Sequence, residues 1–253
     1  MHKFFVDNKD IIDNVIEIEG EDVKHIFKVL RLKVGDKVVV NNLIGQEFLC
    51  ELTEVNKKQV LASVIEELEI NNESPVQVDL FQGMPKSTKM DLICQKCTEL
   101  GINSVTPIMT ERVVVEKGNW DKKLERWRRI TLEACKQSKR TLIPVINEPK
   151  EFSELLESIV GYDLVVVPYE NKENFGLKGV FKDLRESNSL ENIEKVAIII
   201  GPEGGYEEDE INKLSEEGCK IVTLGKRILR TETAGFTALS IIMYELGDLG
   251  GIL

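Results

Sequence analysis

The spacing of hydrophobic residues divides the chain into two parts with different rhythms. In the first part, Glu21–Leu30 has helical spacing, and the other apolar residues form short runs or alternate with polar ones, as in strands. Three runs stand out: Lys37–Leu43, Gln46–Val55 and Gln59–Glu67. Asn41, Asn42 and Gly45 lie at the junction of the first two runs and predict a hairpin turn. Several short strands in a small unit predict a compact β-barrel over residues 1–70.

The polar segment Glu69–Pro75 ends in proline and predicts a linker between two domains. Strand-like and helix-like patterns alternate after it. Strands are expected at Val76–Gln82, Ser104–Met109, Asp163–Pro168, Lys195–Ile200 and Lys220–Leu224, and helices at Lys86–Leu100, Asp121–Ser138, Glu207–Glu217 and Thr231–Gly247. The alternation, together with the wholly apolar run Val196–Ile200, indicates an α/β domain over residues 75–253. Its sheet is expected to be mostly parallel and covered on both faces.

Composition limits the classes of protein to consider. The chain has 253 residues, of which 42% are hydrophobic and 30% charged, so we expect a folded globular protein. No apolar run reaches the roughly 18 residues that a membrane span needs. The first ten residues lack the basic flank and long apolar stretch of a signal peptide. We therefore expect a cytoplasmic protein that has no membrane partner.

The net charge of −11 argues against a uniform nucleic-acid-binding surface, but the charges are unevenly distributed. Residues 117–140 contain nine basic and three acidic side chains. A second basic cluster is formed by Lys24, Lys28, Arg31, Lys33 and Lys37. A basic face on an acidic protein can bind RNA. The alternative for the long basic helix is a solvated amphipathic face.

The five cysteines, in a chain without a recognisable secretory signal, are typical of a reducing compartment. Cys94 and Cys97 form the single C-x-x-C motif, which lacks the second pair or the nearby histidines that a structural zinc site needs. Because the two residues lie three positions apart in a helical pattern, we expect their thiols to be buried. We therefore expect no metal site.

A glycine-rich segment, Gly201–Gly205, follows the apolar strand directly. In an open α/β sheet, ligands bind beyond the carboxyl ends of the strands, and glycine lets the backbone approach a ligand closely. The segment matches neither a dinucleotide fingerprint nor a phosphate loop, which disfavours a nucleotide-dependent dehydrogenase. The alternative is a tight turn before a helix, with Glu207–Glu210 stabilising the helix N-terminus. Glu203, inside the glycine turn, is a candidate for chemistry.

The segment Leu224–Ala234 follows the next strand and opens the closing helix. Its apolar pair, Ile228 and Leu229, suits an adenine or a thioether, whereas Arg230 and Glu232 suit a polar reacting group. The alternative is a structural role, in which a threonine caps the helix and Glu232 interacts with the helix dipole.

Both segments closely resemble the RsmE family, whose members methylate N3 of a uridine in 16S ribosomal RNA. Three further stretches resemble the family in the same order: His25–Asp36, Lys96–Arg112 and Glu133–Arg140. The resemblance covers essentially the whole chain. It implies a protein of the SPOUT class, with a PUA-like RNA-binding β-barrel followed by an α/β domain that carries a C-terminal trefoil knot. Knots are otherwise nearly absent from proteins. The resemblance also implies a homodimer with each active site near the interface.

The resemblance further implies S-adenosylmethionine as methyl donor, 16S ribosomal RNA or the small ribosomal subunit as partner, and no metal. Six residues are expected to bind the donor: Gly201, Gly204, Leu224, Gly225, Ile228 and Leu229. Arg230 is expected to stabilise charge or to position the base. Glu203 and Glu232 compete as proton acceptor, and either needs favourable geometry or a raised pKa. Hydroxide is the third possible acceptor.

The RNA is expected to contact six basic residues: Lys28, Arg31, Arg112, Arg128, Lys136 and Arg140. For Arg112, both the RNA-binding surface and the active site remain open. Two other functions also remain open. One is a SPOUT methyltransferase that acts on another RNA, because a fold does not determine a substrate. The other is a ribosome-associated RNA-binding factor without catalytic activity, which would not bind the methyl donor.

Overall fold

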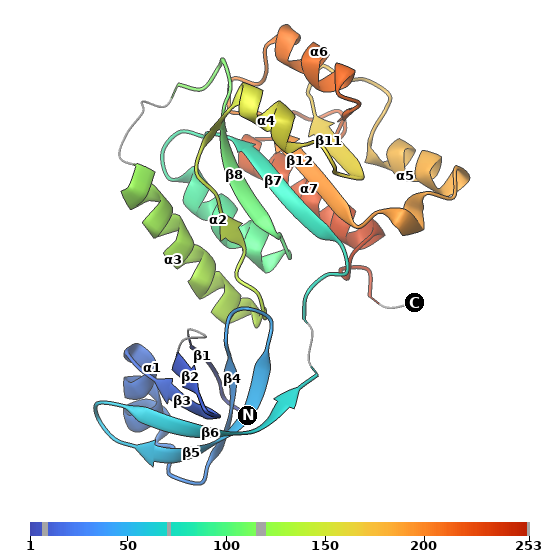
Figure 1. The fold of residues 1–253 in the computed structure, drawn as a ribbon. Coiled ribbons are helices and arrows are strands. Elements are labelled where there is room, and N and C mark those ends of the chain that lie inside the picture. The colour runs from blue at the N-terminus through green and yellow to red at the C-terminus, as the bar shows by residue number, and fades with distance from the viewer. Residues whose placement is uncertain (7–9, 70–71, 115–119, 252–253) are drawn as a thin grey trace. The chain divides into compact units, whose positions relative to one another are not determined.

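The chain forms two compact units (Figure 1). This computed structural model describes residues 1–6, 10–69, 72–114 and 120–251. The first unit consists of Met1–Glu73 with Cys135–Ile143, and the second of Ser74–Ala134 with Pro144–Leu253. Two positions of the expected linker, 70 and 71, lie outside the described residues.

The segment Cys135–Ile143 joins the first unit, although the sequence pattern placed it in the second domain. Leu142 forms an antiparallel bridge with Ile44, and the Gly45 N–H donates to the carbonyl oxygen of Thr141 at 3.1 Å. These backbone contacts with the hairpin turn of the first unit explain why the segment belongs to that unit.

The first unit is built on a six-stranded sheet with the strand order β1-β4-β5-β6-β3-β2. Its elements are β1 Lys3–Phe5, β2 Ile11–Ile12, β3 Val15–Ile18, α1 Glu21–Lys24, the π-helical turn His25–Leu30, β4 Lys37–Asn41, β5 Glu47–Val55 and β6 Val60–Leu68. Neighbouring strands are antiparallel except for β1 and β4. The three strands, the hairpin and the helix expected in this unit are confirmed.

Alternating side chains of these strands build the core of the first unit. Val38 and Val40 of β4, Cys50 and Leu52 of β5, and Ile16 of β3 are fully buried. Since side chains alternate across a strand, the residues between them face outward. The pattern gives the unit a hydrophobic core of its own.

The second unit alternates strands and helices around a seven-stranded sheet. Its strands are β7 Gln77–Gly83, β8 Ser104–Met109, β9 Val145–Ile146, β10 Lys150–Glu151, β11 Leu164–Pro168, β12 Lys195–Ile200 and β13 Lys220–Val222. Its helices are α2 Lys89–Glu99, α3 Trp120–Ser138 (whose last residues belong to the first unit), α4 Phe152–Ser158, α5 Leu177–Glu186, the 3-10 turn Leu190–Asn192, α6 Glu208–Glu216 and α7 Thr231–Glu245. All five expected strands and four expected helices are present, and the additional elements are α4, α5, the short strands β9 and β10, and the 3-10 turn.

Every strand pair of this sheet is parallel, and the order is β10-β8-β7-β12-β11-β13, with β9 beside β8. Helices cover both faces. Ile198 of β12 packs into a cluster with α2, α3, α5 and α7, whereas Ala197 and Ile199 pack with α4 and α6. The apolar strand predicted to lie at the centre is therefore buried on both sides, as a parallel sheet with two helical layers requires.

The cysteines behave as core residues. Cys94 and Cys97 on α2 are fully buried, as expected, and burial raises the pKa of both thiols, that of Cys94 to about 12. A buried thiol with a raised pKa is unreactive. In the described ranges, no group of three potential metal ligands occurs, and no helix has the length and hydropathy of a membrane span.

Candidate functional site

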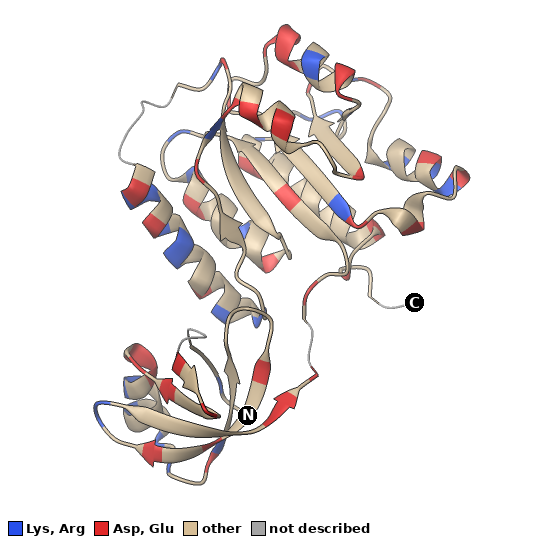
Figure 2. Cartoon of the chain, viewed as in Figure 1, with Lys and Arg blue, Asp and Glu red and all other residues tan. Residues whose placement is uncertain are grey.

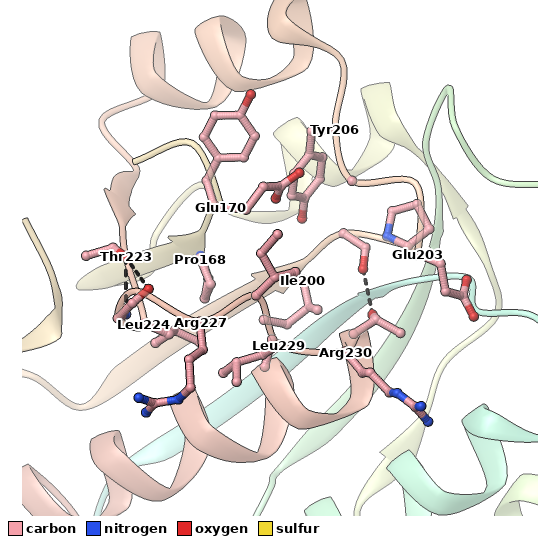
Figure 3. A pocket seen from close by; sticks show the side chains of 18 of the residues that line it. Pro168, Glu170, Ile200, Glu203, Tyr206, Thr223, Leu224, Arg227, Leu229 and Arg230 are labelled. Carbon is pink, nitrogen blue, oxygen red and sulfur yellow. Dashed lines mark hydrogen bonds between the residues drawn. The ribbon is translucent and has the colours of Figure 1, made fainter. Parts of the chain in front are cut away.

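A cavity of about 530 Å³ lies at the carboxyl ends of β11, β12 and β13 (Figure 3). Three loops form most of its wall: residues 168–170 after β11, residues 200–206 after β12, and residues 223–231 after β13. Because the three strands are parallel neighbours, their carboxyl ends meet at one edge of the sheet. The two segments singled out in the sequence therefore lie side by side in space.

The cavity combines apolar side chains with backbone donors that have no partner. Figure 3 shows Pro168, Ile200, Leu224 and Leu229 around it. Among the described residues, only one backbone amide of the segment 224–230 makes a hydrogen bond, that of Gly225 to Oγ1 of Thr223 at 3.2 Å. Apolar walls with a few convergent backbone donors are typical of a site for a flat, partly polar small molecule.

A buried hydrogen-bond chain holds the glycine turn against the closing helix. Strand register sets Gln82 of β7 beside Ile200 of β12. The amide nitrogen of Gln82 donates to Oγ1 of Thr231 at 2.8 Å, and Thr231 Oγ1 donates to the carbonyl oxygen of Gly201 at 2.6 Å. Thr231 is the first residue of α7, and Arg230 is the N-cap of that helix. Through these two hydrogen bonds Thr231 connects the start of α7 to the glycine turn.

Gly83 allows the glycine turn to approach β7. A Cβ on Gly83 would lie 2.4 Å from the backbone nitrogen of Pro202 and 2.7 Å from the carbonyl carbon of Gly201. Both are backbone atoms, which cannot move aside as the end of a side chain can. Only glycine fits at this position, and the sequence pattern did not single it out.

Lys89, which begins α2, forms ion pairs with both candidate carboxylates. Its Nζ lies 2.9 Å from Oε1 of Glu203 and 3.5 Å from Oε2 of Glu232. The second distance is too long for a good hydrogen bond. The backbone N–H of Lys86 also donates to both oxygens of Glu203, at 3.1 and 3.3 Å. The sequence placed Lys89 on a helix without a functional role.

These contacts determine the charge of the cluster. Burial alone would raise the pKa of Glu203, but the hydrogen bond and charge of Lys89 and the backbone N–H groups lower it overall. The hydrogen bond with Glu203 and the nearby negative charges raise the pKa of Lys89. Glu203 therefore lacks the raised pKa that would favour it as a proton acceptor.

Arg112 connects the loop after β8 to the glycine turn. Its Nε donates to Oε1 of Glu207 at 2.7 Å, its Nη2 to Oε2 of the same carboxylate at 3.1 Å, and its Nη1 to the carbonyl oxygen of Gly204 at 3.0 Å. Glu207 and Glu210 also form a capping box at the start of α6. The helix-stabilising role expected for these carboxylates is therefore present, and Glu207 has the bond to Arg112 in addition.

Most of the residues proposed from the sequence for this site line the cavity. They are Gly201, Glu203, Leu224, Gly225, Ile228, Leu229 and Arg230. Gly204 and Glu232 are not part of the cavity wall. Arg230 is exposed, and Ile228 is 86% exposed.

The structure adds Lys89, residues 168–170, Tyr206 and the side chains of Lys226 and Arg227 to the cavity wall. The carboxyl end of β11 was the available signal for residues 168–170, since the strand was predicted to end at Pro168 and ligands bind at such ends. The burial of Tyr206, whose hydroxyl has no hydrogen bond within the described residues, could not be derived from its position in the sequence.

Four of the residues expected to contact RNA differ in exposure and in their charged neighbours. Lys28, Arg31 and Arg128 are exposed, and Lys136 lies 3.8 Å from Asp22 at partial exposure. Figure 2 shows both basic and acidic bands along α3, and mainly acidic ones along α6.

Arg140 is buried, although the sequence interpretation expected it among the residues that contact RNA. Its side chain is 7% exposed, and its Nε donates to Oε2 of Glu73 at 3.0 Å within the first unit. Glu73 also accepts the backbone N–H groups of Thr141 at 2.7 Å and of Leu142 at 3.0 Å. A guanidinium that is buried and bonded in this way holds the chain in place and is not available on the surface for a phosphate.

Family models that match the two units identify the class of protein, an RNA methyltransferase. A family model described as the RNA methyltransferase domain matches residues 72–243, and one described as the RNA methyltransferase PUA domain matches residues 18–65. The first covers the parallel sheet and the whole cavity wall, and the second covers most of the six-stranded sheet.

Full-length relatives make the assignment more specific. The chain is 37% identical over 256 residues to ribosomal RNA small subunit methyltransferase E of Bacillus subtilis, covering 99% of both chains, and 32% identical to that of Mesomycoplasma hyopneumoniae, covering 95% and 98%. The chain belongs to the ribosomal RNA small subunit methyltransferase E family.

Solved structures agree with this membership. The chain is 29% identical to a Neisseria gonorrhoeae ribosomal RNA small subunit methyltransferase E crystallised with S-adenosyl methionine, with a TM-score of 0.82 and coverage of 98% and 99%. It is 31% identical to a Legionella pneumophila methyltransferase in complex with the same cofactor, with a TM-score of 0.79 and 98% coverage of each chain. The predicted PUA-like and α/β architecture is confirmed.

Proposed function

We propose that this protein transfers a methyl group from S-adenosylmethionine to N3 of a uridine in the 16S RNA of the small ribosomal subunit. The observation that carries the proposal is the apolar cavity at the carboxyl ends of β11, β12 and β13, in a chain of this family. A reaction on ribosomal RNA corresponds to the expected cytoplasmic location. The proposed RNA target rests on the similarity to ribosomal RNA small subunit methyltransferases E and on the motif resemblance.

The cavity suits the proposed donor in size and chemistry. Leu224, Ile228 and Leu229 offer apolar contacts to an adenine, and the free backbone N–H groups of the same loop offer donors to its ring nitrogens. Gly201 and Gly225 let the main chain approach the ribose and the methionine part, and Gly225 has a φ of +111°. Gly204 holds the turn through its carbonyl bond to Arg112.

When bound, S-adenosylmethionine supplies a methyl group on a positively charged sulfur. The residues around it need to hold the uracil in line, exclude water and stabilise the charge that develops on the base. Arg230 is suited to contacting the uracil, because its exposed guanidinium at the start of α7 presents paired donors beside the cavity. Glu203 and Glu232 hold Lys89 in the same region.

We assign the exposed basic residues Lys28, Arg31 and Arg128 to the RNA, with Lys136 as a weaker contact. Arg112 belongs with the donor site, since its three donors bind the glycine turn and Glu207. Phosphate contacts position an RNA, and each adds to the salt dependence of binding.

The homodimer and the trefoil knot are further parts of the proposal. Phe175 and Gly176, between β11 and α5, bond with Thr223 after β13, so the segment that follows β11 lies against the third cavity loop. This backbone pairing of two segments far apart in the sequence is the observation that supports the proposed knot. For the dimer, α7 leaves Tyr244 65% exposed near its end. Sedimentation equilibrium of the full chain tests the dimer, and a monomer at micromolar concentration would exclude it.

The function is tested by methyl transfer from labelled donor to small ribosomal subunits from cells that lack this activity. Mass spectrometry of the digested RNA should find one new N3-methyluridine. Donor binding without transfer to this RNA would indicate a methyltransferase with another RNA target. A protein that does not bind the donor would be a non-catalytic RNA-binding factor.

A further inference from the structure

Lys89 lies where three elements meet at the rim of the cavity. It begins α2, Glu203 lies in the turn after β12, and Glu232 lies in the first turn of α7. We propose, on the basis of the proposed function, that Lys89 is the catalytic cation that stabilises the uracil during transfer, and that Glu203 and Glu232 hold Lys89 in place and do not accept the proton.

The placement of the two carboxylates supports this division of roles. Glu232 is buried, with its side chain 10% exposed, and it is not part of the cavity wall. Its Oε2, the oxygen nearest Lys89, is shielded from solvent, so this oxygen is poorly placed to accept a proton from a base in the cavity. Glu203 lines the cavity, but its carboxylate already accepts hydrogen bonds from the ammonium group of Lys89 and from the backbone N–H of Lys86.

Lys89 has the geometry and charge that the carboxylates lack. An ammonium group has three N–H donors. One points to Glu203 at 2.9 Å and a second interacts with Glu232 at 3.5 Å. Within the described residues, no further partner of the ammonium is present, so the third donor is available to a molecule in the cavity. The two carboxylates keep the amine protonated, since they raise its pKa.

The chemistry of the base requires such a group. N3 of the uracil releases its proton to solvent and forms a bond to the methyl carbon, while the carbon–sulfur bond breaks and leaves its electron pair on sulfur. Between these events negative charge spreads over N3 and the two neighbouring carbonyl oxygens. A fixed ammonium donor to one of these oxygens stabilises that charge where it develops. It also favours a base that has a carbonyl oxygen beside a ring N–H.

The test compares Lys89→Met and Lys89→Arg with the wild type and with Lys96→Met. Lys96 lies two turns further along α2 in an exposed ion pair with Glu99, so it controls for the loss of a lysine on this helix. We expect Lys89→Met to lower kcat for methyl transfer by about 10²-fold or more. Donor affinity, measured by calorimetry, should stay close to wild type and thus report an intact fold. Lys89→Arg should recover part of kcat, and Lys96→Met should match the wild type.

The pH dependence separates a catalytic from a structural role. As the pH rises, more of the base is already ionised, so the deficit of Lys89→Met should narrow with increasing pH. A purely structural lysine would give a deficit that does not depend on pH. That result, or a Lys89→Met variant that keeps its rate, would overturn the inference while leaving the proposed function intact. A wild type that methylates no small-subunit RNA would overturn both.

A double-mutant cycle tests the role of Glu203. If Glu203 acts through Lys89, Glu203→Gln should cost less than Lys89→Met, and the double variant should be no slower than Lys89→Met alone. Independent, additive losses would instead identify Glu203 as a proton acceptor in its own right.

Discussion

Arg112 and Glu207 form a bidentate ion pair, with Nε–Oε1 at 2.7 Å and Nη2–Oε2 at 3.1 Å. The third donor of the guanidinium binds the carbonyl oxygen of Gly204 at 3.0 Å. One side chain therefore links the loop after β8, the glycine turn and the start of α6. The hydrogen bonds with Arg112 lower the pKa of Glu207, so the pair is charged at neutral pH.

Replacing this arginine should affect the donor site without unfolding the protein. Arg112→Lys keeps the charge but cannot make three bonds in one plane, so we expect donor affinity to fall several-fold with a nearly unchanged melting temperature. Calorimetric titration with S-adenosylmethionine measures this. Arg126→Ala, which removes an exposed ion pair with Asp91, is the matched control and should bind the donor normally.

Gly83→Ala should displace the glycine turn. The added methyl group would overlap the backbone of Gly201 and Pro202, and overpacking of this kind costs about 1–3 kcal/mol. Donor binding should fall more than stability, since the turn forms the cavity wall. Gly235→Ala is the control, because its methyl group would lie at an ordinary 3.7 Å from Oε1 of Gln82. Equal donor affinity of both variants would contradict the argument.

Arg230→Ala should reduce turnover by about 10²-fold or more and leave donor binding nearly unchanged. The side chain is exposed and makes no hydrogen bond or ion pair with any described residue, so its removal disturbs no internal contact. Single-turnover methyl transfer measures the rate, and Arg185→Ala on α5, which removes an ion pair with Glu245 and no cavity residue, should keep it. A loss of donor affinity would make Arg230 a donor-binding residue.

The pair of Glu73 and Arg140 should make stability depend on pH. Burial by itself would raise the pKa of Glu73, but the bonds and charge of Arg140 and the N–H groups of Leu142 and Thr141 lower it below the ordinary 4.5. The stabilisation is therefore complete above pH 4.5 and is lost as the pH falls through the lower folded-state pKa. Glu73→Gln should lower the free energy of unfolding at pH 7 by about 1.5–3 kcal/mol.

Denaturant unfolding at pH 7 and at acidic pH provides the measurement for this pair. The difference between Glu73→Gln and the wild type should shrink as the pH falls, because the wild-type carboxyl becomes protonated. A difference that is constant between these pH values would show that the charge of Glu73 does not contribute.

Reversing exposed basic charges should weaken RNA binding in a salt-dependent way. Lys28→Glu, Arg31→Glu and Arg128→Glu should each lower affinity, and the slope of log K against log salt should flatten by about 1 for each lost phosphate contact. Filter binding of 16S RNA at several salt concentrations measures both. Lys182→Glu, a charge reversal on α5, should leave the slope unchanged. Arg140→Ala should also leave the slope unchanged if the variant folds, because this side chain is buried.

The sequence alone predicted most of the longer helices and strands and the change from a β-rich part to an α/β part, because strand and helix periodicities are local properties of the chain. It also identified the two cavity loops, since they follow apolar strands and have unusual composition. The short helices α4 and α5 were missed, because their apolar positions repeat over only two or three turns. Most of the expected donor-site residues lie in the cavity for the same local reason.

Only the tertiary structure decided which distant residues meet. Strand order sets Gly83 against Pro202, and the packing of α2 beside α7 sets Lys89 between Glu203 and Glu232. The sequence does not show whether a charged side chain is buried, so only the structure reveals that Arg140 is enclosed and paired with Glu73. Pairs more than a hundred residues apart depend on the order of strands in the sheet, which periodicity does not contain.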